Sequence, residues 1–456
     1  MPEHDIAAMS GADPQTIATP TDPGVRHRKR NLFVVGGSMA VDGGEGSIVS
    51  ALFPVIQVAL GLGTGALGVL SAAGRLIGMV TGPLWVWLAK KTSRKFVFAL
   101  ATGFWGVWSF GAAVSQDFLQ LLIFYTVAAG GLAAGHAIMP EVIGDSFEDR
   151  KRGRVTGLFY GGMAAFGSVL APLIGQLANV EDGWRIGFAV FGGINVLFGI
   201  LIMLFYCDPA SGSAERELAD LTVEQREKTA KVTWSAVISL MRIRSYAVLL
   251  VSRMLSSHML LGAFGVVLLV QDFGFDTAIA ATVLGPFGIG YLVGTFLGGF
   301  LSDWLNRVSP DFGRIGLLQA AQFLFAALAF VTLFGGFEGI GPFLLMFGLL
   351  GLAQGLNPGV NRPLVMAVVP PELRGAAFAI FVSIIESLGF AIYSLLGGFL
   401  AEQIGMTAVI FWLVVVVMAV NGLVLTLLYP VYRHDRDALT SELERRRAAA
   451  LGTTES

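Results

Sequence analysis

Twelve long apolar stretches constrain the fold of this chain more than any other feature of its sequence. Each approaches the roughly 20 residues that a helix needs to cross a bilayer core of about 30 Å. Charged residues make up 14% of the chain, against about 25% in soluble domains. No stretch alternates in the manner of a β-barrel strand, so the sequence predicts an all-α membrane protein with twelve transmembrane helices. The spans are expected near residues 32–58, 65–89, 95–115, 118–140, 155–178, 185–206, 246–270, 278–302, 314–335, 341–362, 375–402 and 407–430.

The lysines and arginines indicate how these spans are oriented. Nearly all of them lie in the two tails or in connections on the same side as the tails, and the connections on the other side hold only Arg185. Positive residues gather in cytoplasmic loops. The pattern therefore predicts a multi-pass protein of the cytoplasmic (inner) membrane with both termini in the cytoplasm. The first apolar stretch is too long for a signal-peptide core, so we expect it to remain as a span.

A charged stretch in the middle of the chain divides the spans six and six. The expected parts are a cytosolic tail (1–31), an N-terminal six-helix bundle (32–206), a cytosolic linker with an amphipathic helix (207–244), a C-terminal six-helix bundle (245–432) and a second cytosolic tail (433–456). The single cysteine, Cys207, cannot form an internal disulfide, and a net charge of −2 gives no footprint for nucleic acid.

Short motifs recur at corresponding places in the two halves. The sequence GLAAG at residues 131–135 corresponds to GLAQG at residues 351–355, and the connection at 87–94 corresponds to the one at 300–307. Parallel six-span repeats, related by an axis along the membrane normal, are typical of transporters whose halves rock around a central site. The two halves are therefore predicted to be pseudo-symmetric bundles.

The segment GFLSDWLNR at residues 299–307 resembles the signature G-x-L-a-D-r-x-G-R of the major facilitator superfamily. The resemblance extends over residues 32–432 and implies the major facilitator fold and transport by alternating access. It assigns a latch at the inner gate to Asp303 with Arg307. In the first half, Lys90 replaces the acidic residue of the signature, which puts the corresponding latch in doubt.

A second gating candidate lies in the fifth span. Its segment GSVLAPLIG at residues 167–175 is similar to the glycine–proline motif of many exporters. Pro172 removes a backbone hydrogen bond and bends the helix, which suits a moving gate.

Within the superfamily, the first half is most similar to the spinster-type branch. The shared features include Asp42 before the segment LFPVIQ at 52–57, and PEVIGDSF at 140–147. Spinster-like proteins move lysolipids and sphingoid lipids, so the resemblance implies a lipid-like substrate. The branch usually carries an arginine early in the fourth span, where this chain has Tyr125. We expect Arg75 of the second span to take that role.

Three of the charged residues inside the predicted spans belong to the first half. Asp42, Glu45 and Arg75 lie near the midplane on neighbouring helices, and the i,i+3 spacing places the two acids on one helical face. An isolated charge at that depth costs about 2.5–3.5 kcal/mol, so we expect the three residues to form a paired cluster. One arginine cannot balance two carboxylates, so one acid is expected to exchange a proton. The alternative is a structural salt bridge between the first two spans.

Two further charged residues, Arg253 and Glu386, lie within spans of the second half at comparable depths. Their pairing would be either a structural bridge or a clamp for an anionic group, since arginine binds carboxylate or phosphate through two parallel hydrogen bonds. Alternatively, Arg253 extends to the inner interface.

Polar residues of the fourth, seventh and tenth spans complete the substrate-binding candidates. These are His136, His258, Asn357 and Asn361, although a lone membrane histidine is more often a packed, hydrogen-bonded residue. Gln322 of the ninth span is expected to be a packing contact.

Together these features predict a secondary active transporter, proton-coupled, for an amphipathic or anionic organic solute, with a lysolipid as one candidate. The alternatives are an uncoupled facilitator and a multidrug or organic-anion exporter. The sequence contains no catalytic cluster, phosphate-binding loop or metal-ligand set, so we expect no enzyme activity, no cofactor and no metal site. The expected partners are the substrate, protons and the lipid bilayer, without nucleic acid, and the chain is expected to be a monomer.

Overall fold

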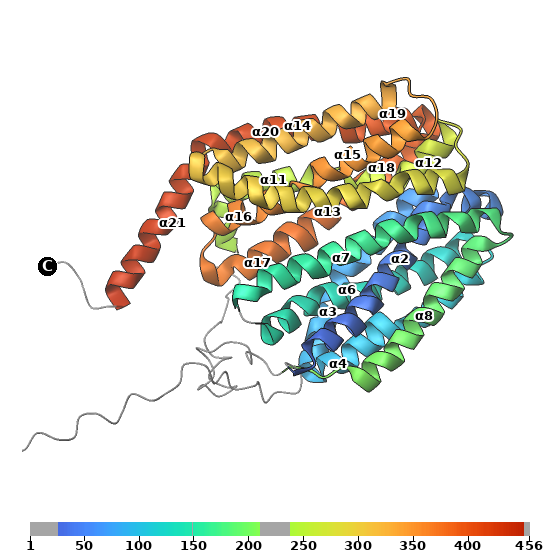
Figure 1. Cartoon of the computed structure of the whole chain (residues 1–456), viewed down its shortest axis with the longest axis horizontal. Helices are drawn as coiled ribbons and strands as arrows, with labels where there is room; N and C mark the ends of the chain where they lie inside the picture. The colour runs from blue at the N-terminus through green and yellow to red at the C-terminus, as the bar shows by residue number, and fades with distance from the viewer. Residues whose placement is uncertain (1–25, 148, 210–237, 451–456) are drawn as a thin grey trace, which may run out of the picture.

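The computed structural model describes residues 26–147, 149–209 and 238–450, and every regular element of those residues is a helix. Figure 1 shows the helices in two bundles, blue to green for the first half of the chain and yellow to red for the second. Eleven helical segments are long and apolar enough to cross a membrane. Helix α7 (Asp149–Gln176), whose last turns belong to a shorter apolar stretch (Val169–Asn179), completes the predicted pattern of twelve.

The first bundle consists of six long helical segments. They are α2 (Arg28–Leu60), α3 (Gly65–Lys91), the segment Arg94–Ala113 that contains α4 (Arg94–Val97) and α5 (Val107–Ala113), α6 (Phe118–Ser146), α7, and α8 (Gly183–Phe205). Helix α2 packs against α7 and α8, and α3 packs against α6. Fully buried aromatic side chains, including Phe53, Trp184 and Phe188, fill the interior.

The second bundle is less regular, because several of its spans are interrupted. Its helices are α11 (Arg244–Met254), α12 (Met259–Gln271), α13 (Thr277–Val308), α14 (Gly313–Phe334), α15 (Gly341–Gly355), α16 (Pro358–Val368), α17 (Arg374–Phe378), α18 (Ser387–Ile404), α19 (Met406–Ile410), α20 (Val417–Val424) and α21 (Leu428–Ala450). The seventh span breaks between α11 and α12, and Pro358 opens α16 after a break in the tenth. A π-helical stretch at Ala379–Glu386 separates α17 from α18. Such stretches are frequent at functional sites.

Several helices run past the predicted apolar limits on the side of the termini. Helix α13 ends at Val308, and α21 continues to Ala450 through much of the predicted cytosolic tail. Hydropathy marks only the part of a helix that lies in the bilayer, whereas charged residues prolong these helices beyond it. The charged middle of the predicted linker and residues 233–237 of its amphipathic part lie outside the described residues.

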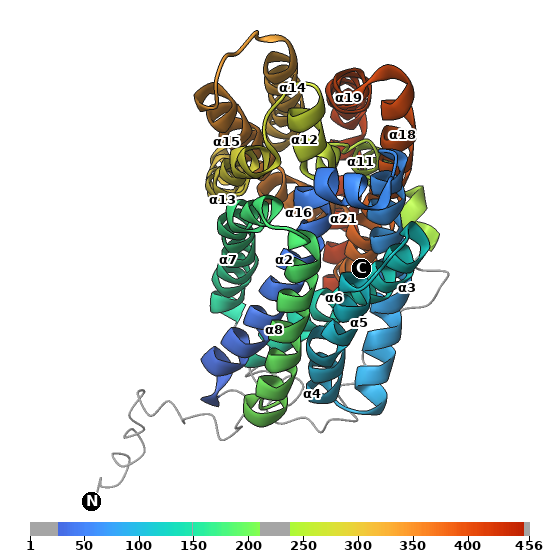
Figure 2. The same cartoon turned by 90° about the vertical axis from the view of Figure 1, so that its right-hand side faces the viewer.

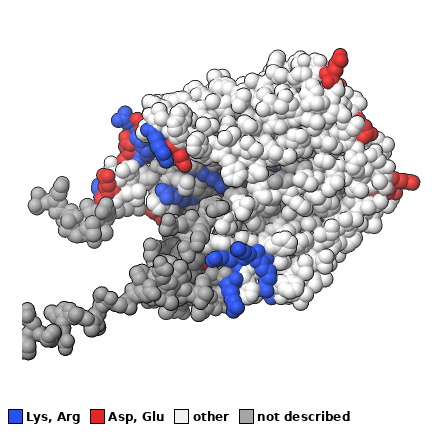
Figure 3. All heavy atoms as spheres, viewed as in Figure 1, with Lys and Arg blue, Asp and Glu red and all other residues white. Residues whose placement is uncertain are grey.

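Charged side chains gather at the two ends of the molecule. In Figure 3 the side wall is uncharged, Lys and Arg cluster together with some Asp and Glu at the end where α2 begins and α21 ends, and Asp and Glu mark the opposite end. We call these the tail end and the far end. Exposed hydrophobic residues such as Phe296 and Phe300 belong to the wall. An apolar belt between two polar ends is what a bilayer requires, and the chain is a multi-pass membrane protein.

The two bundles meet at the far end, from which Figure 2 views the molecule, with the first bundle below the second. The backbone N–H of Gly65, the first residue of α3, donates to Glu402 Oε1 of α18 over 2.8 Å. Gly68 and Gly398 lie next to each other, and the absence of side chains there lets α3 and α18 approach closely. At the tail end a hollow opens between the bundles (Figure 3). The protein is thus closed at the far end and open at the tail end.

Candidate functional site

The predicted acid pair lies on one face of α2, inside the first bundle. Asn195 of α8 contacts both acids: its Nδ2 donates to Asp42 Oδ1 over 2.6 Å and to Glu45 Oε2 over 3.3 Å. Ser109 of α5 donates its hydroxyl to Glu45 Oε1 over 2.5 Å. Glu45 is only 7% exposed and Asn195 only 1%. The two carboxyl groups are therefore held together by uncharged donors from two other helices.

Two buried oxygen atoms of this cluster have no hydrogen-bond partner, namely Asp42 Oδ2 and Asn195 Oδ1. A buried polar atom without a partner is costly and calls for a physical explanation. Sequence reasoning missed both Asn195 and Ser109. A single polar residue in an apolar span gives a weak signal, and only its depth, similar to that of Asp42 and Glu45, could have suggested the contact.

The predicted pairing of Arg75 with these acids is wrong. The Arg75 guanidinium contacts Met259 Sδ of α12 at 3.6 Å and lies 5.3 Å from the centre of the Phe390 ring of α18. Its side chain is exposed, and among the described residues no ion pair joins it to a carboxylate. Arg75 instead extends from the first bundle to the second, where it contacts Met259 and Phe390.

Aromatic and basic side chains connect the two bundles around Arg75. Tyr125 of α6 lies within electrostatic range of both Glu45 and Arg75. His136, on the same helix, is exposed and stacks on Tyr160 of α7, with ring centroids 6.1 Å apart and planes inclined by 12°. Arg362 of α16 is also exposed and lies within electrostatic range of Tyr160. These residues place two exposed guanidinium groups near the interface of the bundles.

Arg253 and Glu386 form an ion pair, as their similar depths predict. The Arg253 and Glu386 side chains are only 15% and 13% exposed. The Arg253 guanidinium also lies 5.4 Å from the centre of the Phe381 ring, in the π-helical stretch that Glu386 ends. The alternative in which Arg253 extends to the membrane interface is therefore wrong.

Five polar side chains from four spans form a continuous buried chain of hydrogen bonds. Asn421 donates to Gln322 over 3.3 Å, Gln322 to Asn357 over 2.5 Å, and Asn357 to Gln354 over 3.1 Å. Gln354 Nε2 then meets His258 Nε2 at 2.6 Å. A hydrogen bond from the Gln354 amide N–H to His258 Nε2 requires the neutral His258 tautomer that carries its proton on Nδ1. From the sequence, Gln322 is expected to be a packing contact. It is instead part of this polar network.

The remaining tenth-span candidate, Asn361, is buried in α16 at 9% exposure. The latch residues Asp303 and Arg307 lie in the last turns of α13 rather than in a loop. Asp303 pairs with Arg314 of α14 over 3.3 Å. The predicted pairing of Asp303 with Arg307 is not among the ion pairs of the described residues, because the start of the next helix offers a closer cation.

A clamp at the tail end of the first bundle was not predicted. Arg94, at the start of α4, donates to Asp145 Oδ2 of α6 over 2.5 Å and to Asp208 Oδ1 over 2.8 Å. Its third partner is the backbone carbonyl of Pro209. Arg94 is the last residue of the connection at 87–94, so it occupies the position that Arg307 has in the second half.

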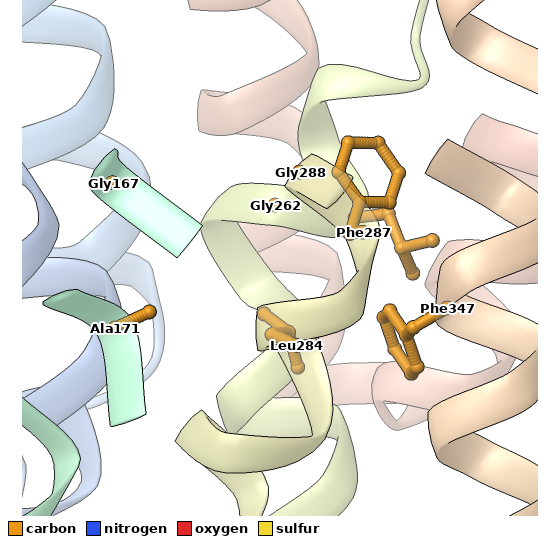
Figure 4. Close-up of a pocket in the computed structure, with 8 residues that line it drawn as sticks. Gly167, Ala171, Gly262, Leu284, Phe287, Gly288 and Phe347 are labelled. Atoms are coloured by element: carbon orange, nitrogen blue, oxygen red, sulfur yellow. The ribbon is translucent and has the colours of Figure 1, made fainter. Parts of the chain in front are cut away.

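An apolar cavity of about 190 Å³ lies between the bundles (Figure 4). Gly167 and Ala171 of α7 form one side, and Phe287 of α13 and Phe347 of α15 belong to the other. Pro172 directly follows Ala171, and α7 continues through it to Gln176. The cavity can accept an apolar group of a bound molecule.

Comparison with known proteins identifies the family. The family model of the Major Facilitator Superfamily matches residues 35–331 and 308–453. Protein spinster of Drosophila melanogaster is 27% identical over 359 residues, which is 75% of this chain and 57% of that protein. The chain thus spans little more than half the length of this relative. A probable 4-methylmuconolactone transporter of Cupriavidus pinatubonensis is 23% identical over 413 residues, covering 88% of this chain and 91% of the relative.

A solved structure has the same fold. The crystal structure of a bacterial homologue of the human lysosomal transporter spinster, inward-facing and unoccupied, superposes with a TM-score of 0.70 at 18% identity. The match covers 91% of this chain and 98% of the other. The fold and the similarity to spinster expected from the sequence are both confirmed. The chain belongs to the Major Facilitator Superfamily, a family of membrane transporters rather than enzymes.

Proposed function

We propose that this protein is a proton-coupled secondary transporter that moves an anionic, amphipathic organic molecule across the cytoplasmic membrane by alternating access. The observation that carries the proposal is the buried acid pair, Asp42 and Glu45, which shares one uncharged amide. The Asp42 and Glu45 oxygens that accept from this amide lie 2.6 and 3.3 Å from its nitrogen, so the two oxygens are less than 6 Å apart. Two ionised carboxylates at roughly 6 Å repel each other by about 3 kcal/mol at an effective dielectric constant of about 20. Among the described residues no cation pairs with either acid. The pair therefore favours holding one proton, and release of that proton supplies the coupling.

Arg75 supports the choice of an anionic substrate. It is exposed between the bundles and lacks an ion-pair partner among the described residues, and its guanidinium fork suits a carboxylate or phosphate group. The apolar cavity beside Phe287 and Phe347 suits the apolar part of the same molecule. One relative is named as a probable transporter of 4-methylmuconolactone, a small organic molecule, and the similarity to spinster favours a lysolipid.

The arrangement of the bundles supports alternating access. The Gly65–Glu402 hydrogen bond closes the far end, while the tail end is open (Figure 3). With both termini in the cytoplasm, as the basic residues predict, this is the inward-facing state. The opposite state requires the far-end contacts to break while the tail-end surfaces approach.

Flux into proteoliposomes tests the proposal. Three probes are compared, each with and without a pH gradient: a fluorescent anionic lysophospholipid, an aromatic carboxylate and a cationic dye. We expect the gradient to accelerate an anionic probe, and we expect Asp42→Asn and Glu45→Gln to remove that acceleration. Glu338→Gln, at an exposed carboxylate of the far end, is the matched control. Gradient-independent flux would indicate a facilitator and flux of the dye alone a multidrug exporter, and either result overturns the proposal.

A further inference from the structure

We infer that, in the tail-end-open state, Asp42 carries a proton on Oδ2 and donates it to Asn195 Oδ1. Asn195 is then the positioning residue that makes Asp42, rather than Glu45, the proton carrier. This inference rests on the proposed proton coupling and assigns the proton to a single oxygen atom. The inference is based on the hydrogen-bond donors and acceptors around Asp42, Glu45 and Asn195.

The acid pair has four carboxyl oxygens but only three hydrogen-bond donors among the described residues. Asp42 and Glu45 together present four carboxyl oxygens. The Asn195 amide supplies one N–H to Asp42 Oδ1 and one to Glu45 Oε2, and Ser109 supplies its hydroxyl to Glu45 Oε1. The fourth oxygen, Asp42 Oδ2, is buried without a partner. Glu45 is thus satisfied as a carboxylate, whereas Asp42 is not.

The Asn195 side chain also lacks a hydrogen-bond partner. Its Oδ1 is an acceptor, and it is also buried without a partner. A carboxylic acid and a primary amide form a cyclic pair, in which the amide N–H donates to one acid oxygen and the acid O–H donates to the amide oxygen. The first of these two bonds is present at 2.6 Å. In such a pair, one proton on Asp42 Oδ2 supplies the donor that Asn195 Oδ1 lacks.

The opposite orientation of the Asn195 amide needs more protons, not fewer. With the amide reversed, Oδ1 would face both carboxyl groups, and Asp42 and Glu45 would each have to be protonated to donate to it. The orientation found here, in which Nδ2 faces both acids, requires a single proton. It therefore matches a site that binds and releases one proton.

Few charged groups act on the acid pair formed by Asp42 and Glu45. Among the described side chains, Glu45 is the charged group that acts on Asp42. Tyr125 of α6 lies within electrostatic range of Glu45, and Arg75 of α3 acts on Tyr125 and on His136 of α6. Among the described residues no cation pairs with Asp42 or Glu45, so the proton itself is the cation that neutralises Asp42.

Loss of this proton would change how α2 and α8 pack. Without it, Asp42 Oδ2 and Asn195 Oδ1 become two buried acceptors with no donor, which is unfavourable in a low-dielectric interior. Separation of α2 from α8, or entry of water between them, relieves that cost. Asn195 therefore links the proton on the first span to the position of the sixth.

Infrared difference spectroscopy on the purified full-length protein tests the inference without any substrate. The carbonyl-stretch band of protonated carboxylic acids is followed while the pH is raised. We expect a band in the wild type that disappears in Asp42→Asn and persists in Glu45→Gln. We expect Asn195→Leu to shift the frequency of this band and its pH midpoint, because the acid loses its amide partner. Ser109→Ala should leave the band on Asp42.

The outcomes separate the inference from the proposed function. A band that persists in Asp42→Asn and disappears in Glu45→Gln would place the proton on Glu45 and overturn the inference, even if transport is proton-coupled. An unchanged frequency and midpoint in Asn195→Leu would remove the positioning role. If that variant does not fold, the comparison of Asp42→Asn with Glu45→Gln still decides the location of the proton. A band on Asp42 together with gradient-independent flux would support the inference and refute the coupling.

Discussion

Removal of the Glu402 carboxylate should shift the protein from the far-end-closed state toward the far-end-open state. Glu402, near the C-terminal end of α18, accepts the backbone N–H of Gly65 over 2.8 Å. Gly65 is the first residue of α3, and Thr64 before it makes no side-chain cap. Glu402 therefore acts as the cap of a helix in the other bundle, and this contact exists only while the far end is closed.

The expected free-energy change follows from the loss of a helix cap that is exposed to solvent. Replacing a good N-terminal cap with alanine costs about 0.5–2 kcal/mol, and a carboxylate near a helix N-terminus contributes about 0.3–1 kcal/mol through the helix dipole. Glu402 is exposed, so solvent screening places the total near 1 kcal/mol. A difference of about 1 kcal/mol changes the ratio of the two states about fivefold. Glu402→Gln keeps an acceptor oxygen and should have a smaller effect than Glu402→Ala.

Spin-label distances measure this ratio directly. Cys207 is the only cysteine, so Cys207→Ser gives a cysteine-free background. Labels at Asn179→Cys and Glu338→Cys, both exposed at the far end, report the separation of the two bundles there. We expect the ratio of the long-distance to the short-distance population to rise about fivefold in Glu402→Ala and to remain unchanged in the matched control Gln403→Ala. Equal distance distributions in both variants would refute the reasoning.

Three further predictions follow from other contacts. Glu386→Gln leaves the buried Arg253 guanidinium without its charge partner and should destabilise the protein by about 3 kcal/mol or more. The measurement is the fraction of monodisperse protein that remains after heating. Adding Arg253→Met to the same chain should recover most of the lost stability, and no recovery would argue against the pair. Gly68→Val places a side chain against the Ser394 backbone, so the spin-label distances at the far end should lengthen, and an unchanged distribution contradicts this. Arg75→Gln should raise KM for the anionic substrate at least about tenfold, since a charged hydrogen bond contributes about 1.5–3 kcal/mol. Arg75→Lys, which keeps the positive charge, should raise KM less. An equal rise in KM for a cationic probe would count against an anion site.

The spans could be predicted because each helix in a bilayer carries its own hydropathy signal. The limits of the helices could not, because helices such as α13 and α21 continue into water with charged residues. The breaks at residues 255–258 and at Asn357 also escaped prediction, since an interrupted span is as apolar as a continuous one.

The site was predicted where the signal is local and missed where it depends on helix packing. Asp42 and Glu45 share a face because they are three residues apart. Depth along the membrane normal correctly suggested that Arg253 and Glu386 pair. The same reasoning failed for Arg75, because depth gives no information about which neighbour a helix turns toward. The depth of Asn195 matches that of the acids, but a single polar residue in an apolar span gives too weak a signal to assign it to the site.

The central claim is that proton movement through Asp42 is coupled to transport, and proton flux measures it most directly. A pH-sensitive dye is enclosed in proteoliposomes, and the anionic probe that the protein carries is added outside without an imposed gradient. The account predicts a change of internal pH that depends on the probe, is lost in Asp42→Asn and is retained in Glu338→Gln. Transport of the probe without a pH change, or a pH change that survives Asp42→Asn, would contradict it.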